Sequence, residues 1–289
     1  MQREANFMKR MGELLAFHKI INRPEDLNDD NFDESIVEFQ EKVDIMSDGN
    51  PKWETLWQLQ FPWIQQQPKL NFVKCDADKL PGIEGYEHLL LRQDAAERYN
   101  ELRNEVLSLG GVIPTAGGKR DLSEGAALGR SATSMHYPGL AFDLAGGAGF
   151  FKPDTDPFVI TLGGSGYWEA WCRAPRGQET KLNALYWDDT TSAKDRTKTI
   201  QGKFFSFTKT AAKHGFTPIR PRLSFTRAKD RKYIGCEWWH FQANDLLIPN
   251  LSQLGIELMR IAEYTPEYIR NANDTVWGRK QAIFQQDWF

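Results

Sequence analysis

Long apolar stretches are missing from this 289-residue sequence. No run reaches the roughly eighteen apolar residues that a membrane-spanning helix needs, so we expect no membrane partner. The first ten residues are charged and lack the apolar centre of a secretory signal peptide. We therefore expect a chain without a signal peptide that is synthesised in the cytoplasm.

Cysteine is scarce, and the charges nearly balance. Cys75, Cys172 and Cys236 form an odd, sparse set, which argues against a disulfide framework and predicts small buried residues. The net charge is only −3, so the sequence predicts no nucleic-acid partner. Apolar residues make up 40% and charged residues 26%, the balance of an ordinary folded globular protein, which we expect to be a monomer.

The most informative segment is 134–143, with the sequence Ser-Met-His-Tyr-Pro-Gly-Leu-Ala-Phe-Asp. It places His136 and Asp143 seven positions apart, and His240 follows almost a hundred residues later. Two imidazoles and one carboxylate are the ligand set of a catalytic zinc ion, with a fourth position open for water. Glu237, three residues before His240, is a second carboxylate placed where a general base could lie.

A simpler interpretation has to be weighed against this one. A single His followed by an Asp is more often an ordinary surface or core pair. Five fixed positions within ten residues, however, would arise by chance on the order of once in ten thousand chains of this length. A thiolate from Cys236 is conceivable as a fourth ligand, but three nitrogen and oxygen ligands already suffice.

The two segments together resemble a known family of zinc peptidases. The pattern S-x-H-x-x-G-x-A-x-D, followed by E-W-W-H, is similar to that of the enzymes that cut peptidoglycan stem peptides. These include D-Ala-D-Ala carboxypeptidases, D-Ala-D-Ala dipeptidases and the L-alanyl-D-glutamate endopeptidases of phage endolysins. The resemblance covers roughly residues 105–245. It implies that His136, Asp143 and His240 bind Zn²⁺ and that Glu237 is the catalytic base.

The resemblance also implies residues that contact the substrate. An Arg upstream of the first motif does so in the family, and Arg120 matches it here, without the Ser-Gly-aromatic turn that usually precedes it. Ser134 is expected to bind substrate or to hydrogen-bond a metal ligand. Trp238 and Trp239 are expected to line the site, although packing in the core is an alternative for this pair.

The implied function is a zinc-dependent peptidase that hydrolyses peptide bonds in peptidoglycan stem peptides. Such an endolysin-like enzyme would reach the cell wall after release or injection, with peptidoglycan as its partner. The E-W-W-H segment favours an alternative, a D-Ala-D-Ala dipeptidase or carboxypeptidase acting on wall precursors. A further alternative is a non-catalytic wall-binding phage structural protein. The intact Glu237 argues against it, because a structural zinc ion needs no base.

Hydrophobic periodicity predicts two domains, a small helical one over 1–65 and a peptidase domain over 66–289. Helices are expected over 10–21, 35–43 and 53–59. The segment 61–68, with two prolines and three glutamines, is the predicted linker.

The N-terminal helices carry a second resemblance. Phe39-Gln40, then Asp48-Gly49, then Thr55-Leu56 follow the F-Q…D-G…T-L pattern of the second half of a peptidoglycan-binding repeat. This resemblance implies a wall-binding module. The alternative is a helical cap that packs on the rest of the chain and binds nothing.

The rest of the sequence predicts an α+β fold, a small antiparallel sheet flanked by helices. The expected elements are a helix over 87–109, a strand from 112, a cleft-shaping loop over 115–134, a hairpin of 158–162 with 167–172, an inserted loop over 173–200, a helix over 203–214, a strand over 234–243 and two helices after 251. On a regular strand, Glu237 and His240 would face opposite sides. We therefore expect a bulge or a strand end between them.

Overall fold

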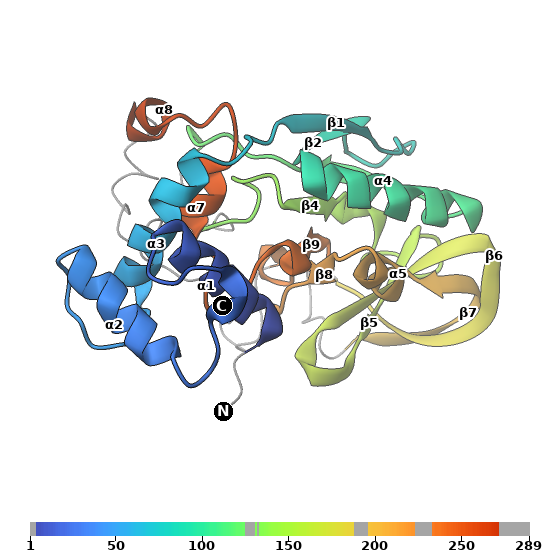
Figure 1. Ribbon diagram of the computed structural model, residues 1–289. Coiled ribbons are helices and arrows are strands. Elements are labelled where there is room, and N and C mark those ends of the chain that lie inside the picture. Colours follow the sequence, from blue (N-terminus) through green and yellow to red (C-terminus); the bar gives the residue numbers. More distant parts are fainter. Residues whose placement is uncertain (1–3, 125–130, 132, 188–195, 223–232, 272–289) are drawn as a thin grey trace. The chain divides into compact units, whose positions relative to one another are not determined.

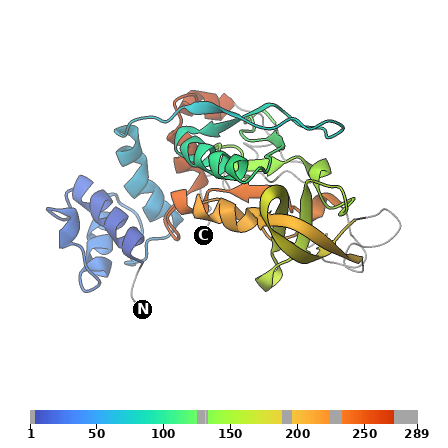
Figure 2. The same ribbon diagram turned by 90° about the vertical axis from the view of Figure 1, so that its right-hand side faces the viewer.

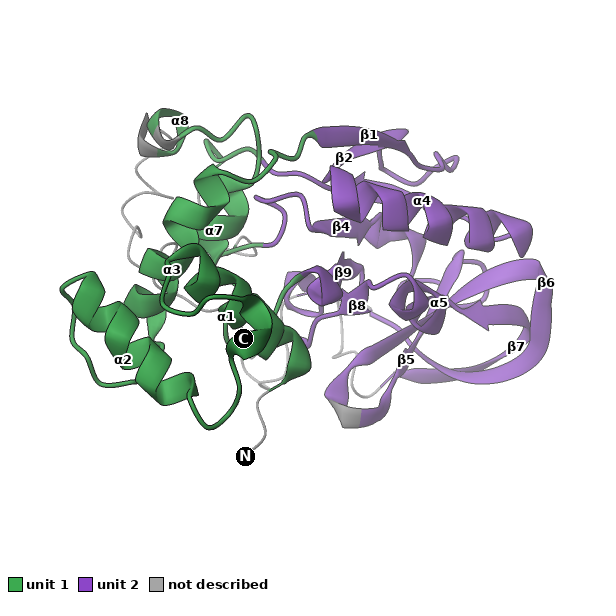
Figure 3. Ribbon diagram, in the orientation of Figure 1, with its two compact units in different colours: residues 1–71, 121–134, 247–289 green, residues 72–120, 135–246 purple. Residues whose placement is uncertain are grey.

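The computed structural model describes residues 4–124, 131, 133–187, 196–222 and 233–271. The chain forms two compact units, which Figure 3 shows in separate colours. Unit 1 comprises residues 1–71, 121–134 and 247–289, and unit 2 comprises residues 72–120 and 135–246. Helices and small antiparallel sheets together give the predicted α+β class. Across the described ranges, no helix is both long and apolar enough to cross a membrane.

Three helices open unit 1 and lie together in both views, in blue shades (Figures 1 and 2). They are α1 (Ala5–Phe17), α2 (Phe32–Lys42) and α3 (Trp53–Gln65), with the short turn η1 (Pro24–Asp26) after α1. Each buries an apolar face, which is why the 3.6-residue period predicted them. The shared core contains Met11, Leu14, Leu15, Phe32, Ile36, Phe39, Leu56, Leu59 and Leu251.

Helix α3 is longer than expected. The predicted linker over 61–68 is wrong in its first half, because the helix continues through Pro62 as far as Gln65. Proline removes one backbone hydrogen bond and disfavours a helix interior. Burial of Leu59 and Ile64 on the inner face of α3 offsets that cost.

Unit 1 also contains a segment from late in the chain. It holds α7 (Leu254–Met259) and α8 (Pro266–Asn271). Gln60 on α3 donates its side-chain N–H to the carbonyl oxygen of Leu251 at 3.1 Å and to Oε1 of Gln253 at 3.2 Å. Residues 247–271 therefore cluster with the N-terminal helices, whereas the sequence assigned them to the second domain. Contacts between residues so far apart leave no local pattern in the sequence.

The residues of the F-Q…D-G…T pattern form one internal network. The Gln40 side chain is 1% exposed. Its amide donates to Thr55 Oγ1 at 3.0 Å, the Asn50 carbonyl at 3.1 Å and Asp48 Oδ1 at 3.2 Å. Its Oε1 accepts from the backbone N–H of Gly49 at 2.9 Å. The pattern thus fixes the loop between α2 and α3.

Within its described residues, unit 2 contains three antiparallel sheets and the helices α4 and α5. One sheet pairs β1 (Phe72–Asp76) with β2 (His88–Arg92). A second has the order β3-β4-β9-β8, formed by β3 (Thr115–Gly117), β4 (Ala141–Leu144), β9 (His240–Gln242) and β8 (Thr217–Pro218). A third joins β5 (Phe158–Leu162), β6 (Trp168–Leu185) and β7 (Thr197–Ser206).

The helices are α4 (Gln93–Ser108), which contacts β1 and β2, and α5 (Phe207–Lys213), which contacts α4 and β6. Short 3-10 turns complete the unit: η2 (Gly146–Ala148), η3 (Gly164–Gly166), η5 (Tyr233–Gly235) and η6 (Asn244–Leu246).

Two predicted helices begin later than expected. The first five residues of the segment 87–109 belong largely to β2, where Leu89 and Leu91 are buried while Leu90 is 42% exposed. That alternation is the two-residue period of a strand. The helix expected over 203–214 begins only at Phe207, after β7, where Ser206 Oγ accepts the Lys209 N–H at the helix N-terminus.

The region expected to be an inserted loop, 173–200, is mostly sheet. The predicted hairpin is confirmed by β5 and β6, but β6 continues to Leu185 and pairs with β7 from Thr197 onward. This longer ribbon has its own core of Val159, Leu182, Ala184, Ile200 and Phe204. The polar composition hid the strands because half of each strand faces solvent.

Candidate metal centre

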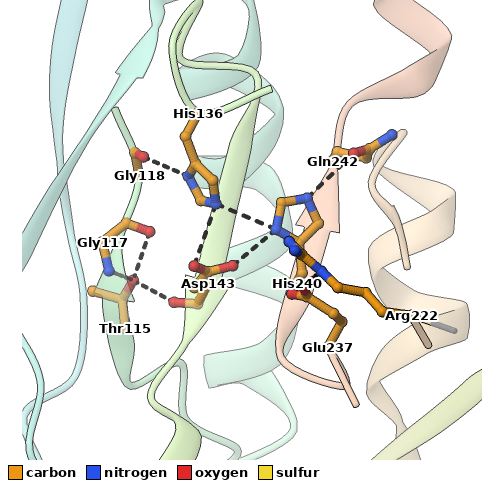
Figure 4. A network of polar contacts seen from close by, with 9 residues as sticks. All are labelled: Thr115, Gly117, Gly118, His136, Asp143, Arg222, Glu237, His240 and Gln242. Atoms are coloured by element: carbon orange, nitrogen blue, oxygen red, sulfur yellow. Dashed lines mark hydrogen bonds and ion pairs between the residues drawn. The ribbon is translucent and has the colours of Figure 1, made fainter. Parts of the chain in front are cut away.

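Two neighbouring strands of unit 2 place two of the predicted ligands opposite each other. Asp143 lies on β4 and is the register partner of His240, the first residue of β9. His136 lies in the turn that leads into β4, where the Leu140 N–H donates to the Met135 carbonyl at 2.9 Å. Figure 4 shows the three side chains converging from these elements.

Gly139 explains the glycine of the first motif. Its φ of +67° lies in the left-handed region that favours glycine. A Cβ there would lie 2.7 Å from the backbone N of Arg92 and 2.6 Å from the Phe72 ring. The Gly139 carbonyl accepts the Arg92 N–H at 2.9 Å, so this close approach ties the His136 turn to β2.

The donor atoms of the three side chains lie close together. Nε2 of His136 is 3.2 Å from Nδ1 of His240 and 3.3 Å from Oδ2 of Asp143. Nδ1 of His240 is 3.0 Å from Oδ1 of Asp143. The ligand atoms all lie within 4.8 Å of one another, so this buried group could hold a metal ion.

Each imidazole is oriented by a carbonyl oxygen on its outer side. His136 Nδ1 donates to the Gly118 carbonyl at 2.6 Å, and His240 Nε2 donates to Gln242 Oε1 at 3.2 Å (Figure 4). These contacts leave Nε2 of His136 and Nδ1 of His240 facing inward, where they could bind a metal ion. Such outer hydrogen bonds fix the ring orientation and increase the basicity of metal-binding histidines.

Burial sets the electrostatics of the group. His136 is 3% exposed and His240 is 7% exposed. Burial alone would raise the pKa of Asp143, but the neighbouring His136 and His240 hold that pKa well below its usual range. Burial alone would lower the pKa of His240, but the hydrogen bond and charge of Asp143 raise it above its ordinary value. A positive charge is therefore favoured at the centre of the group.

Glu237 lies just before β9, in a tight turn. Its φ is +56°, and its carbonyl accepts the His240 N–H at 3.2 Å. The expected strand end between Glu237 and His240 is confirmed, since β9 begins at His240. The Glu237 carboxylate is buried and forms a salt bridge with Arg222, whose Nε–H it accepts (Figure 4).

Arg120 and Ser134, the predicted substrate contacts before β4, are not part of the His136–Asp143–His240 group. The backbone N–H of Arg120 donates to the His136 carbonyl at 3.0 Å, while its guanidinium lies 5.8 Å from the centre of the Tyr137 ring. Ser134 is half-buried and is the last residue of the unit 1 segment 121–134.

The two tryptophans have different environments. Trp238 is fully buried, and its ring centre lies 6.1 Å from that of Phe158. Trp239 is half-buried, and its carbonyl accepts the Leu144 N–H at 2.9 Å, which links β4 to the Glu237 turn. Trp238 thus fills the core, and Trp239 is the member of the pair with accessible surface.

Arg222 and Gln242 are contacts of the site that sequence reasoning missed. Gln242 lies two residues after His240, and residues two apart on a strand share a face, so this spacing was a usable signal. Arg222 is fifteen positions before Glu237, and no sequence pattern points to it.

Comparison with known proteins adds no relatives to this description. No family model matches the chain, and no curated protein and no solved structure matches it.

Proposed function

We propose that this chain is a zinc-dependent peptidase that hydrolyses peptide bonds in peptidoglycan stem peptides. The observation that carries the proposal is the convergence of His136, Asp143 and His240, with Glu237 in the adjoining turn. These residues are also the fixed positions of the two motifs that resemble the stem-peptide zinc peptidases.

The spacing of the donor atoms supports zinc as the metal. Bonds of about 2.0–2.1 Å at tetrahedral angles place neighbouring ligand atoms about 3.3 Å apart. The two imidazole nitrogens lie 3.2 Å apart, close to this spacing, and Asp143 meets His136 through Oδ2 at 3.3 Å and His240 through Oδ1 at 3.0 Å. Bound there, zinc would supply an electrophile that acidifies water and polarises a peptide carbonyl.

The protein's own residues would manage the protons and the substrate. Glu237 would accept a proton from the attacking water and pass it to the leaving amine. Arg120 is proposed to contact the substrate carbonyl or carboxylate, a role in which its charge would stabilise the developing oxyanion. Ser134 and Trp239 are proposed as substrate contacts, and the buried Trp238 lies against Trp239, with ring centres 6.0 Å apart.

The test is digestion of purified sacculi and soluble stem peptides by zinc-loaded protein, followed by mass spectrometry. New amino and carboxyl termini within the stem peptide are expected, and they also separate an endopeptidase from a D-Ala-D-Ala carboxypeptidase. Zinc should bind at one ion per chain and be lost in His136→Ala. Full zinc content in that variant, or intact peptides after digestion by the wild type, would contradict the proposal.

We also propose that unit 1 binds the polymeric wall. The pattern residues Gln40, Asp48 and Thr55 hold the α2–α3 loop and so support the module's shape. An open groove of about 1360 Å³ beside this loop offers a surface, lined by Glu4, Phe7, Asp29, Phe32, Asp33, Glu34, Val37, Asp48, Gly49, Asn50, Pro51 and Asn250. This groove is the proposed contact with peptidoglycan.

Sedimentation with sacculi tests this second part. Glu34→Lys replaces a carboxylate of the groove by a cation and is expected to reduce the sedimented fraction. Glu38→Lys is the matched control, because Glu38 is exposed on the same helix but does not line the groove. Equal sedimentation of both variants and the wild type would argue against the groove.

A further inference from the structure

The salt bridge of Glu237 joins a buried carboxylate to an accessible guanidinium. The Glu237 side chain is 7% exposed, and the Arg222 side chain is 37% exposed. The accessible part of the pair is therefore the arginine. Figure 4 shows Arg222 reaching toward Glu237 and His240 from the side opposite to His136 and Asp143.

Arg222 is attached to the Glu237 turn at two points. Its Nε–H donates to Glu237 Oε1, and its backbone N–H donates to the Gly235 carbonyl at 2.8 Å. Gly235 lies two residues before Glu237, so the arginine is anchored to the same turn as the carboxylate that it contacts. The planar guanidinium presents its N–H donors in a fixed fork geometry, and the backbone contact anchors the start of the side chain beside the Glu237 turn.

The two carboxylates of the site consequently have separate partners. Asp143 contacts His136 and His240, whereas Glu237 contacts Arg222. A glutamate without such a partner could rotate about its side-chain torsions toward the metal-binding atoms and become a ligand. Because a general base must stay within hydrogen-bond reach of the proton that it accepts, its orientation matters for rate.

We propose that Arg222 is the positioning residue for Glu237. It holds the carboxylate in the orientation of a base and keeps it apart from the ligand set. The catalytic part of this inference rests on the proposed function. The ion pair itself belongs to the metal-free chain and can be measured there.

Kinetics with a soluble stem peptide test the catalytic part. Arg222→Gln should keep one zinc per chain and KM within about twofold, while kcat falls about ten- to a hundredfold, the scale of a misplaced catalytic group. Arg222→Lys keeps the positive charge but lacks the planar donor. Its kcat should lie between those of the wild type and Arg222→Gln. Arg220→Gln is the matched control, because that exposed arginine lies over the Tyr167 ring, and it should leave kcat unchanged.

Urea unfolding of the metal-free protein tests the pair without any catalysis. Arg222→Gln should lower the unfolding midpoint, because it leaves a buried carboxylate unpaired. In a Glu237→Gln background the same substitution should change the midpoint little. Additive midpoint shifts would show that the two side chains do not interact.

Three outcomes of these measurements would overturn the positioning role. They are an unchanged kcat in Arg222→Gln, a raised KM at constant kcat, and loss of zinc from that variant. If the wild type cuts no stem peptide, the proposed function fails and Arg222 is a structural partner only. The unfolding cycle still decides the ion pair in that case.

Discussion

The buried polar cluster around Gln40 in unit 1 and the one around His136 in unit 2 are completed in different ways. In unit 1, the Gln40 side-chain amide finds all its hydrogen-bond partners within the chain. Its NH₂ group donates to Thr55, Asn50 and Asp48, and its oxygen accepts from Gly49. In unit 2, the inward-facing atoms of two imidazoles and a carboxylate face one another and favour a positive charge. A sequence motif can therefore mark a loop whose polar groups satisfy one another or a group of side chains that could hold a metal ion, and only the second kind points to chemistry.

The largest expected effect is on turnover. Glu237→Gln should lower kcat by about a hundredfold to ten-thousandfold, because it removes the proton acceptor. The zinc content should stay at one ion per chain, because Glu237 is outside the group that could hold the metal. Steady-state kinetics and elemental analysis check this together. Loss of zinc along with turnover would make Glu237 a ligand.

Metal binding should stabilise the folded state through unit 2. Zinc at a hundred times its Kd is expected to raise the free energy of unfolding by about 2.7 kcal/mol, since it binds the assembled ligands only in the folded chain. Urea denaturation of chelator-treated protein with and without added zinc measures the difference. His136→Ala serves as the control, and a stabilisation that survives in this variant would locate the metal elsewhere.

A substitution in the Gln40 cluster of unit 1 should lower the free energy of unfolding by the same amount with and without zinc. Gln40→Ala is expected to cost about 1–3 kcal/mol of unfolding free energy, because it leaves buried donors and acceptors without partners. Gln65→Ala, at an exposed position near the end of α3, should stay within about 0.5 kcal/mol of the wild type. If the cost of Gln40→Ala changed when zinc was added, the two clusters would not be independent.

The smallest expected effect is a pH dependence of the α2–α3 loop. Lys52 and the Asn50 N–H lower the pKa of Asp48 from 3.8 to about 2. Since the folded-state pKa is the lower one, this contribution to stability is present above about pH 4 and is lost as the pH falls toward 2. Unfolding midpoints of metal-free wild type and Asp48→Asn, compared across that range, should converge on acidification. A constant difference would mean that Asp48 does not titrate with the loop.

The grouping of His136, Asp143 and His240 was expected from the two motifs and the family that they resemble, and the structure brings the three side chains together. Asp143 and His240 each lie on a short strand, and Gly139 marks the turn that brings His136 beside them. The carbonyl oxygen of Gly118 and the side chain of Arg222 could not be predicted, because tertiary packing brings them to the site. Any residue type has a backbone carbonyl, so the sequence carries no sign that Gly118 orients His136.

Secondary structure was predictable where one period dominated. The apolar faces of α1 and α2 are examples, although their ends shifted by several residues. The Leu89-Leu90-Leu91 run was ambiguous, since three consecutive leucines fit a helix or a strand until their burial is known. At Pro62, burial of the helix face outweighed a local preference that the sequence displays clearly.

The contacts of Gln60 with Leu251 and Gln253 have a consequence for the order of folding. They bridge 191 and 193 positions of the chain. During synthesis the N-terminal helices emerge well before Leu251, a member of their core, has been made. Unit 1 therefore completes its core last, after all of unit 2 has been synthesised. Until then its apolar helix faces depend on one another alone, and the nascent chain is most exposed to aggregation in this interval.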